Sequence, residues 1–145
     1  MSTDRFHLQR FVDAQLSAYE QALGELRAGQ KQSHWIWFIF PQLDGLGRSE
    51  TARFYSIKSI GEATEYLEHP VLGTRLLECT EAMLAINRKS AHEILGFPDD
   101  LKFHSSMTLF GFLSADVPAF NSALDRFFDS NLDLQTVELL TKLRG

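Results

Sequence analysis

The sequence contains few of the features that mark exported or membrane-spanning proteins. It has a single cysteine, Cys79, which excludes an internal disulfide and favours a reducing compartment, so we predict a cytoplasmic protein. The densest apolar run, residues 35–40, is far shorter than the roughly 20 residues of a membrane-spanning helix. The first residues lack the long apolar core of a signal peptide. We therefore expect neither export nor membrane insertion.

Basic residues and metal-ligand patterns are also scarce. Lys and Arg total 14 against 19 Asp and Glu, a formal net charge of −5, and no stretch is dominated by basic residues. Nucleic acid is therefore not an expected partner, because phosphate backbones are bound through positive patches. The five histidines show no metal-ligand spacing with one another or with Cys79. We expect no metal and no cofactor.

What the sequence does have is a dense series of helix signals. Twelve phenylalanines and a hydrophobic content of 44% are enough for a packed core. Capping boxes, in which a Ser is followed three residues later by Glu, occur at Ser17, Ser59 and Ser90. Further candidate N-caps are Asp116 and Asp133, and Gly29 and Gly96 are suited to helix C-termini.

These signals predict an all-α fold in one domain, residues 1–145. The expected arrangement is about eight to ten short helices around a central apolar helix at residues 33–40. The predicted helices cover residues 5–14, 17–28, 33–40, 49–56, 60–68, 70–87, 91–95, 100–113, 117–128 and 134–143. A small β element at residues 35–40 and 107–110 is the alternative, since both are rich in β-favouring residues, but neither has a strand-like partner elsewhere.

The first candidate site residues lie in the stretch from Ser33 to Gln42. The simplest interpretation is a buried core helix, because the stretch is apolar all round. The functional alternative is that Trp35 and Trp37, flanked by His34 and Gln42, form the aromatic wall of a small-molecule pocket.

The second candidate stretch begins at Asp99. On a helix, Lys102, Ser105 and Ser106 lie one turn apart, with Thr108 following. An ammonium and hydroxyls near a helix N-terminus suit a phosphate or carboxylate. Two alternatives remain. In the first, Lys102 acts as a base toward Ser106. In the second, the hydroxyls donate to carbonyls of the preceding turn while Lys102 pairs with Asp99 or Glu93.

Several long motifs resemble one known family. They are residues 8–15 (LQRFVDAQ), 33–42 (SHWIWFIFPQ), 62–67, 69–73 (HPVLG) and 99–110 (DDLKFHSSMTLF). Together they are similar to the family catalogued as domain of unknown function 1810, nearly end to end. Its members are sometimes labelled calpastatin, but that inhibitor is an extended, disordered polypeptide, unlike a chain with capped helices and an aromatic core. The resemblance implies no established activity and transfers no catalytic residues.

Two functional hypotheses follow, and whether the chain is an enzyme stays open between them. In the first, the Trp35 helix and the segment from Lys102 to Thr108 line an aromatic pocket for a small anionic ligand, either nucleotide-like or phosphorylated. In the second, the chain is a non-catalytic interaction or adaptor module, which predicts an exposed apolar patch of several hundred Å². The sequence does not determine the oligomeric state.

Overall fold

The computed structural model describes residues 4–144 and shows an all-α fold. Within that range there are nine helices: α1 (Gln9–Arg27), α2 (Ile36–Ile39), α3 (Glu50–Phe54), α4 (Ile60–Glu68), α5 (Leu72–Leu84), α6 (Ala91–Leu95), α7 (Asp99–Leu113), α8 (Pro118–Phe128) and α9 (Leu134–Arg144). The only β-type pairing in the described part is an isolated parallel bridge between Leu43 and Ile57. The all-α prediction is confirmed, and both stretches considered as strands contain helix.

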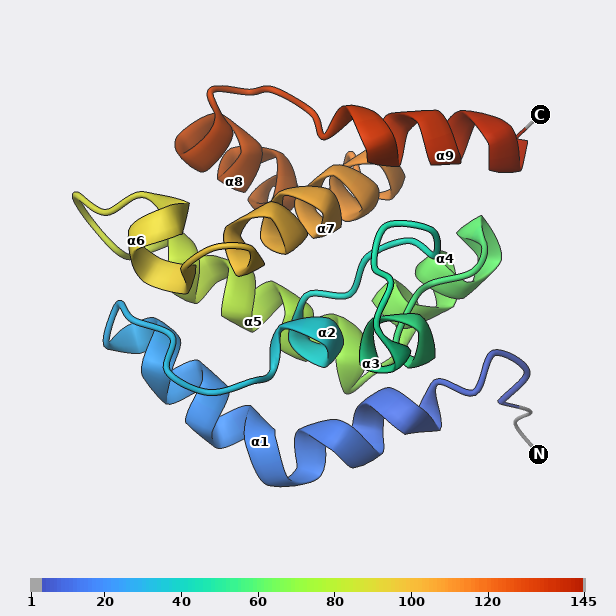
Figure 1. Cartoon of the computed structure of the whole chain (residues 1–145), viewed down its shortest axis with the longest axis horizontal. Coiled ribbons are helices and arrows are strands. Elements are labelled where there is room, and N and C mark those ends of the chain that lie inside the picture. Colours follow the sequence, from blue (N-terminus) through green and yellow to red (C-terminus); the bar gives the residue numbers. More distant parts are fainter. Residues whose placement is uncertain (1–3, 145) are drawn as a thin grey trace.

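The helices stack so that α5 and α7 form the interior (Figure 1). α1 lies along one side and packs against α5, which on its other side contacts α8. α7 packs against five other helices, namely α2, α4, α6, α8 and α9. Eight of its fifteen residues are buried, including the consecutive run from Ser105 to Gly111. None of the described helices is both long enough and apolar enough to cross a membrane.

The N-terminal helix differs from the prediction, which placed two helices at residues 5–14 and 17–28. α1 is one continuous helix, and Ser17 lies exposed in its interior rather than at an N-cap. The buried residues Phe11, Gln15, Tyr19, Ala22 and Leu26 recur every three or four positions along one face. Because this face is unbroken, tertiary burial outweighs the local capping preference of Ser17.

Most other caps follow the sequence. The Ser90–Glu93 capping box is complete, and Ser59 accepts the backbone N–H of Glu62 at 3.0 Å. Asp133 caps α9, accepting the backbone N–H of Thr136 at 3.2 Å. Asp116 does not cap α8, whose N-cap is Val117 with Pro118 in the first turn. Gly29 and Gly96 both adopt positive φ at helix ends, as expected of glycine there.

The aromatic helix expected at residues 33–40 is only one turn long. α2 ends at Ile39, since Phe40 precedes Pro41 and the residue before a proline disfavours helical geometry. Trp35, directly before α2, is buried and donates its indole N–H to Glu25 Oε1 at 2.8 Å. Burial raises the pKa of Glu25, but hydrogen bonds from Ser33, Gln32 and Trp35 outweigh it and hold that pKa at about 2.

Candidate functional site

Three of the eight predicted site residues line one pocket of about 500 Å³, here called the Lys102 pocket. It lies between the loop after α2, the first turns of α7 and the segment that leads into α9. The predicted residues on its wall are Gln42, Lys102 and Ser105. The others that line it are Leu46, Gly47, Pro98, Leu101, His104, Leu132, Asp133, Leu134 and Gln135.

The Lys102 ammonium is held only loosely by protein groups. Its Nζ lies 3.5 Å from Asp99 Oδ1, too far for a good hydrogen bond, while Lys31 Nζ approaches Asp99 Oδ2 to 2.7 Å. Asp99 therefore belongs mainly to the buried Lys31. Lys102 also lies over the indole of Trp37, 5.0 Å from the ring centroid. An anion entering the pocket would meet an ammonium without a strong partner.

The hydroxyls of Ser105 and Thr108 are engaged within the protein. Ser105 Oγ lies 3.1 Å from the Leu101 carbonyl and 3.0 Å from Asp133 Oδ2. Thr108 Oγ1 donates to the His104 carbonyl at 2.9 Å and accepts the Asp133 N–H at 3.0 Å. These bonds to the preceding turn, with the Lys102–Asp99 pair, match the simpler of the two alternatives from the sequence. The two bonds to Asp133 hold the start of α9 against α7.

Ser106 and Trp37 stand apart from this pattern. Ser106 Oγ and Trp37 Nε1 are the two buried side-chain polar atoms in the described part of the chain that have no hydrogen-bond partner. With about 3.6 residues per turn, Ser106 projects between the directions of Lys102 and Phe103. Lys102 contacts Trp37, and the Phe103 ring is 4.8 Å from that of Phe40. Ser106 is therefore on the side of α7 whose residues contact Trp37 and Phe40.

The unpartnered state of Ser106 has a measurable consequence. Ser106→Ala is expected to raise the free energy of unfolding by about 1 kcal/mol, because a buried hydroxyl without a partner is costly. Ser105→Ala is the matched control and should lower it by about 1 kcal/mol, since that hydroxyl is bonded. Urea denaturation measures both. Equal losses in the two variants would show that Ser106 has a partner after all.

The remaining predicted residues lie outside the Lys102 pocket. His34 is exposed and, with Trp37, lines a separate hollow of about 530 Å³ beside α3. Trp35 is buried in the core, and Thr108 lines a cavity on the α9 side of α7. No hydrogen bond joins Lys102 to Ser106 in the described structure, so the proposed base and nucleophile are not paired. Burial raises the pKa of the Cys79 thiol to about 12, which makes it a poor nucleophile.

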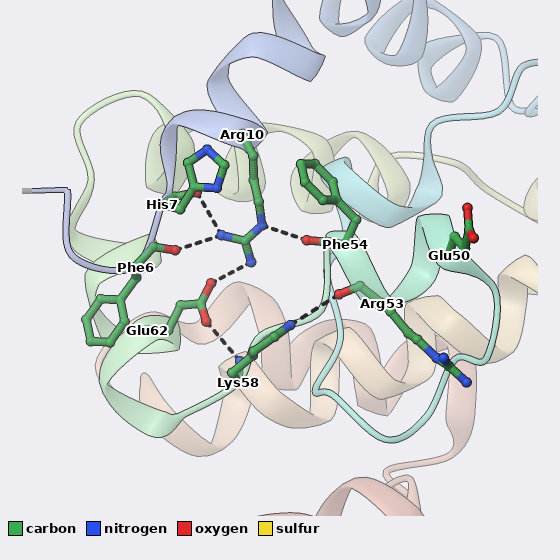
Figure 2. A pocket seen from close by; sticks show the side chains of 8 residues that line it. All are labelled: Phe6, His7, Arg10, Glu50, Arg53, Phe54, Lys58 and Glu62. Carbon is green, nitrogen blue, oxygen red and sulfur yellow. Dashed lines mark hydrogen bonds and ion pairs between the residues drawn. The ribbon is translucent and has the colours of Figure 1, made fainter.

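Arg10 and Glu62, which were not among the predicted site residues, form a buried ion pair in another pocket of about 500 Å³, the Arg10 pocket (Figure 2). Their side chains are 6% and 3% exposed, and Arg10 Nη2 lies 2.7 Å from Glu62 Oε2. The guanidinium also donates to the carbonyls of Phe6, His7, Phe54 and Ser56. Figure 2 shows most of these bonds converging on Arg10.

All five N–H donors of Arg10 are used in these contacts. Glu62 is similarly engaged, because its other oxygen accepts the backbone N–H of Lys58 at 2.9 Å. Neither group is free to bind a ligand, so we assign the pair a structural role. The one sequence signal for it was the position of Arg10 next to Phe11, on the buried face of α1.

The comparisons with known proteins agree with this fold. The family model described as "Protein of unknown function (DUF1810)" matches residues 5–140. The chain belongs to this family. It is similar in structure to the conserved hypothetical protein Rv1873 from Mycobacterium tuberculosis, with a TM-score of 0.94 and 47% sequence identity. The alignment covers 95% of this chain and 99% of the other. No curated protein matches the sequence. The DUF1810 family and its structural relative leave the function unknown.

Proposed function

We propose that this DUF1810 protein binds a small phosphorylated, hydroxyl-bearing ligand, such as a nucleotide or a sugar phosphate, in the Lys102 pocket. The observation that carries the proposal is the loosely held Lys102 ammonium on the wall of a 500 Å³ pocket. That volume lies within the range of small-molecule sites. The buried Cys79 thiol supports a location in the cytoplasm.

The pocket wall matches the two chemical ends of such a ligand. Lys102 supplies the positive charge for a phosphate. Asp133 would repel a second anionic group, but its carboxylate accepts hydrogen bonds from sugar hydroxyls, and only its Oδ2 is engaged by Ser105 and Thr136. The amides of Gln42 and Gln135 offer both donors and acceptors. This division of charge favours a phosphorylated sugar over a dicarboxylate.

The unpartnered atoms beside Lys102 support the same location. Buried polar groups normally have partners, and exceptions call for an explanation. Lys102 Nζ lies 5.0 Å from the centroid of the Trp37 ring, and Ser106 projects from the same side of α7, so a shift of Lys102 toward a bound anion would increase access to Trp37 Nε1 and Ser106 Oγ. In that state their hydrogen bonds would be completed by the ligand or by water that enters with it.

A thermal-shift screen with nucleotides, sugar phosphates and dicarboxylates tests the proposal. A ligand at a hundred times its Kd stabilises the native state by about 2.7 kcal/mol, which raises Tm. Lys102→Ala should lose this shift. Lys142→Ala removes the same charge from an exposed position on α9, outside the Lys102 pocket, and should keep it. A shift that persists in Lys102→Ala would place the ligand elsewhere.

One observation favours the interaction-module hypothesis instead. Leu101, Leu132 and Leu134 are exposed and line the Lys102 pocket, and the exposed Phe97 directly precedes Pro98 on the same wall. Leu134 is 79% and Phe97 73% exposed, and large exposed apolar surfaces are typical of protein-interaction sites. Under this hypothesis none of the anions in the thermal-shift screen changes Tm.

A further inference from the structure

Another cavity, not lined by Lys102, is formed by residues of α7, α8 and α9 and of the segment before α9. These three helices are in the upper part of Figure 1. Its volume is about 360 Å³, and sites between packed helices of this size commonly take small ligands. Only Leu132 belongs to both this cavity, here called the α9 pocket, and the Lys102 pocket.

The wall of the α9 pocket is mainly apolar. Phe112, Leu132, Val137 and Leu140 line it together with the buried backbone of Gly111. The hydroxyls of Thr108 and Thr141, which also line it, each donate to a carbonyl of their own helix. The amide of Asn121, which also lines the cavity, donates to the Gly111 carbonyl at 3.3 Å. A hydrocarbon chain would therefore displace water from apolar surface without taking a partner from these hydroxyls or from this amide.

Arg144 is the one charged side chain among the residues that line the α9 pocket in the described structure. It comes from the last turn of α9, and its guanidinium carbon lies 5.4 Å from the centroid of the Phe112 ring. The guanidinium is thus close to the apolar wall and can meet a carboxylate there with two parallel hydrogen bonds.

We infer that the α9 pocket binds a small amphiphilic carboxylate, such as a medium-chain fatty acid, with the chain against Val137 and Leu140 and the carboxylate on Arg144. The apolar wall selects the chain, and the single positive group selects the sign of the headgroup. The inference does not rest on the function proposed for the Lys102 pocket.

An NMR titration of the full chain with decanoate tests the inference. Decanoate is expected to shift the backbone amides of Thr108, Gly111 and Val137. Arg144→Gln should weaken its affinity by about five- to tenfold, as expected for loss of a charge-assisted contact near the surface. Lys142→Gln makes the same change of charge two residues away on α9, outside the pocket wall, and should leave affinity unchanged.

Two further probes separate charge from apolar binding. Decanol and decyltrimethylammonium, which carry the same chain, should bind more weakly than decanoate. Val137→Phe, which fills part of the cavity, should reduce binding of decanoate while circular dichroism shows the helical content intact. The inference is overturned if all three probes bind alike, if Arg144→Gln and Lys142→Gln give the same affinity as wild type, or if the amides of the α9 pocket do not shift.

Discussion

Replacing Arg10 with Met is expected to lower the free energy of unfolding by about 3–5 kcal/mol. The substitution keeps an apolar stem of similar length but leaves the buried Glu62 carboxylate without its ion-pair partner. It also removes the donors that satisfy the carbonyls of Phe6, His7, Phe54 and Ser56. Because a single guanidinium serves all five acceptors, the loss affects the N-terminal arm, α3 and α4 together. Urea denaturation at neutral pH measures it.

Arg5→Met is the matched control for this prediction. Arg5 pairs with Glu65 at 2.7 Å, but its side chain is 68% exposed, so the loss should not exceed about 1 kcal/mol. Similar losses in the two variants would mean that burial of the Arg10 pair adds nothing to its effect. A variant Arg10→Lys should fall between wild type and Arg10→Met, because an ammonium keeps the positive charge opposite Glu62 but has three donors and cannot reproduce the five-bond arrangement.

The second large effect is expected at Gly73, in the first turn of α5. A Cβ at this position would overlap the backbone carbonyl oxygen of Leu67 and lie 2.9 Å from its carbonyl carbon. Backbone cannot rotate away as a side chain would, so Gly73→Ala must separate the end of α4 from the start of α5. We expect a loss of at least about 2 kcal/mol in the free energy of unfolding.

The same substitution at Gly24 should have the opposite sign. Gly24 lies inside α1, and a Cβ there has no heavy atom within 4 Å outside its own helix. Gly24→Ala therefore gains helix propensity without a clash and should raise the free energy of unfolding by about 0.5–1 kcal/mol. Thermal denaturation of Gly73→Ala and Gly24→Ala measures the two changes in stability. A neutral Gly73→Ala would contradict close packing of α4 against α5.

Local signals predicted the helices well where they agreed with burial. Ser59, Ser90 and Asp133 cap helices because nothing in the packing opposes them. Ser17 has the same local pattern, but the continuous buried face of α1 overrides it. The one-turn length of α2 follows from Pro41, which the sequence showed. The packing of α7 against five other helices was not predictable from the sequence, because the burial of a helix depends on which helices surround it in the fold.

Only part of the candidate site could be predicted from the sequence, for a similar reason. Spacing on one helix showed that Lys102, Ser105 and Ser106 share a face, and the structure brings Lys102 and Ser105 together with Gln42 in one pocket. Spacing cannot show which hydroxyl is already bonded, since Ser105 meets Asp133 from a segment 28 residues away. The Arg10–Glu62 pair joins positions 52 residues apart and leaves no local pattern to read.

Leu132 belongs to the walls of both the Lys102 pocket and the α9 pocket, so a ligand in one pocket can change the affinity of the other pocket for its ligand. The residue immediately precedes Asp133, which ties the start of α9 to α7. An occupant that displaces Leu132 on one side reshapes the wall on the other. Linkage then requires the effect to be mutual: whatever factor a phosphorylated ligand imposes on the affinity for a carboxylate, the carboxylate imposes in return.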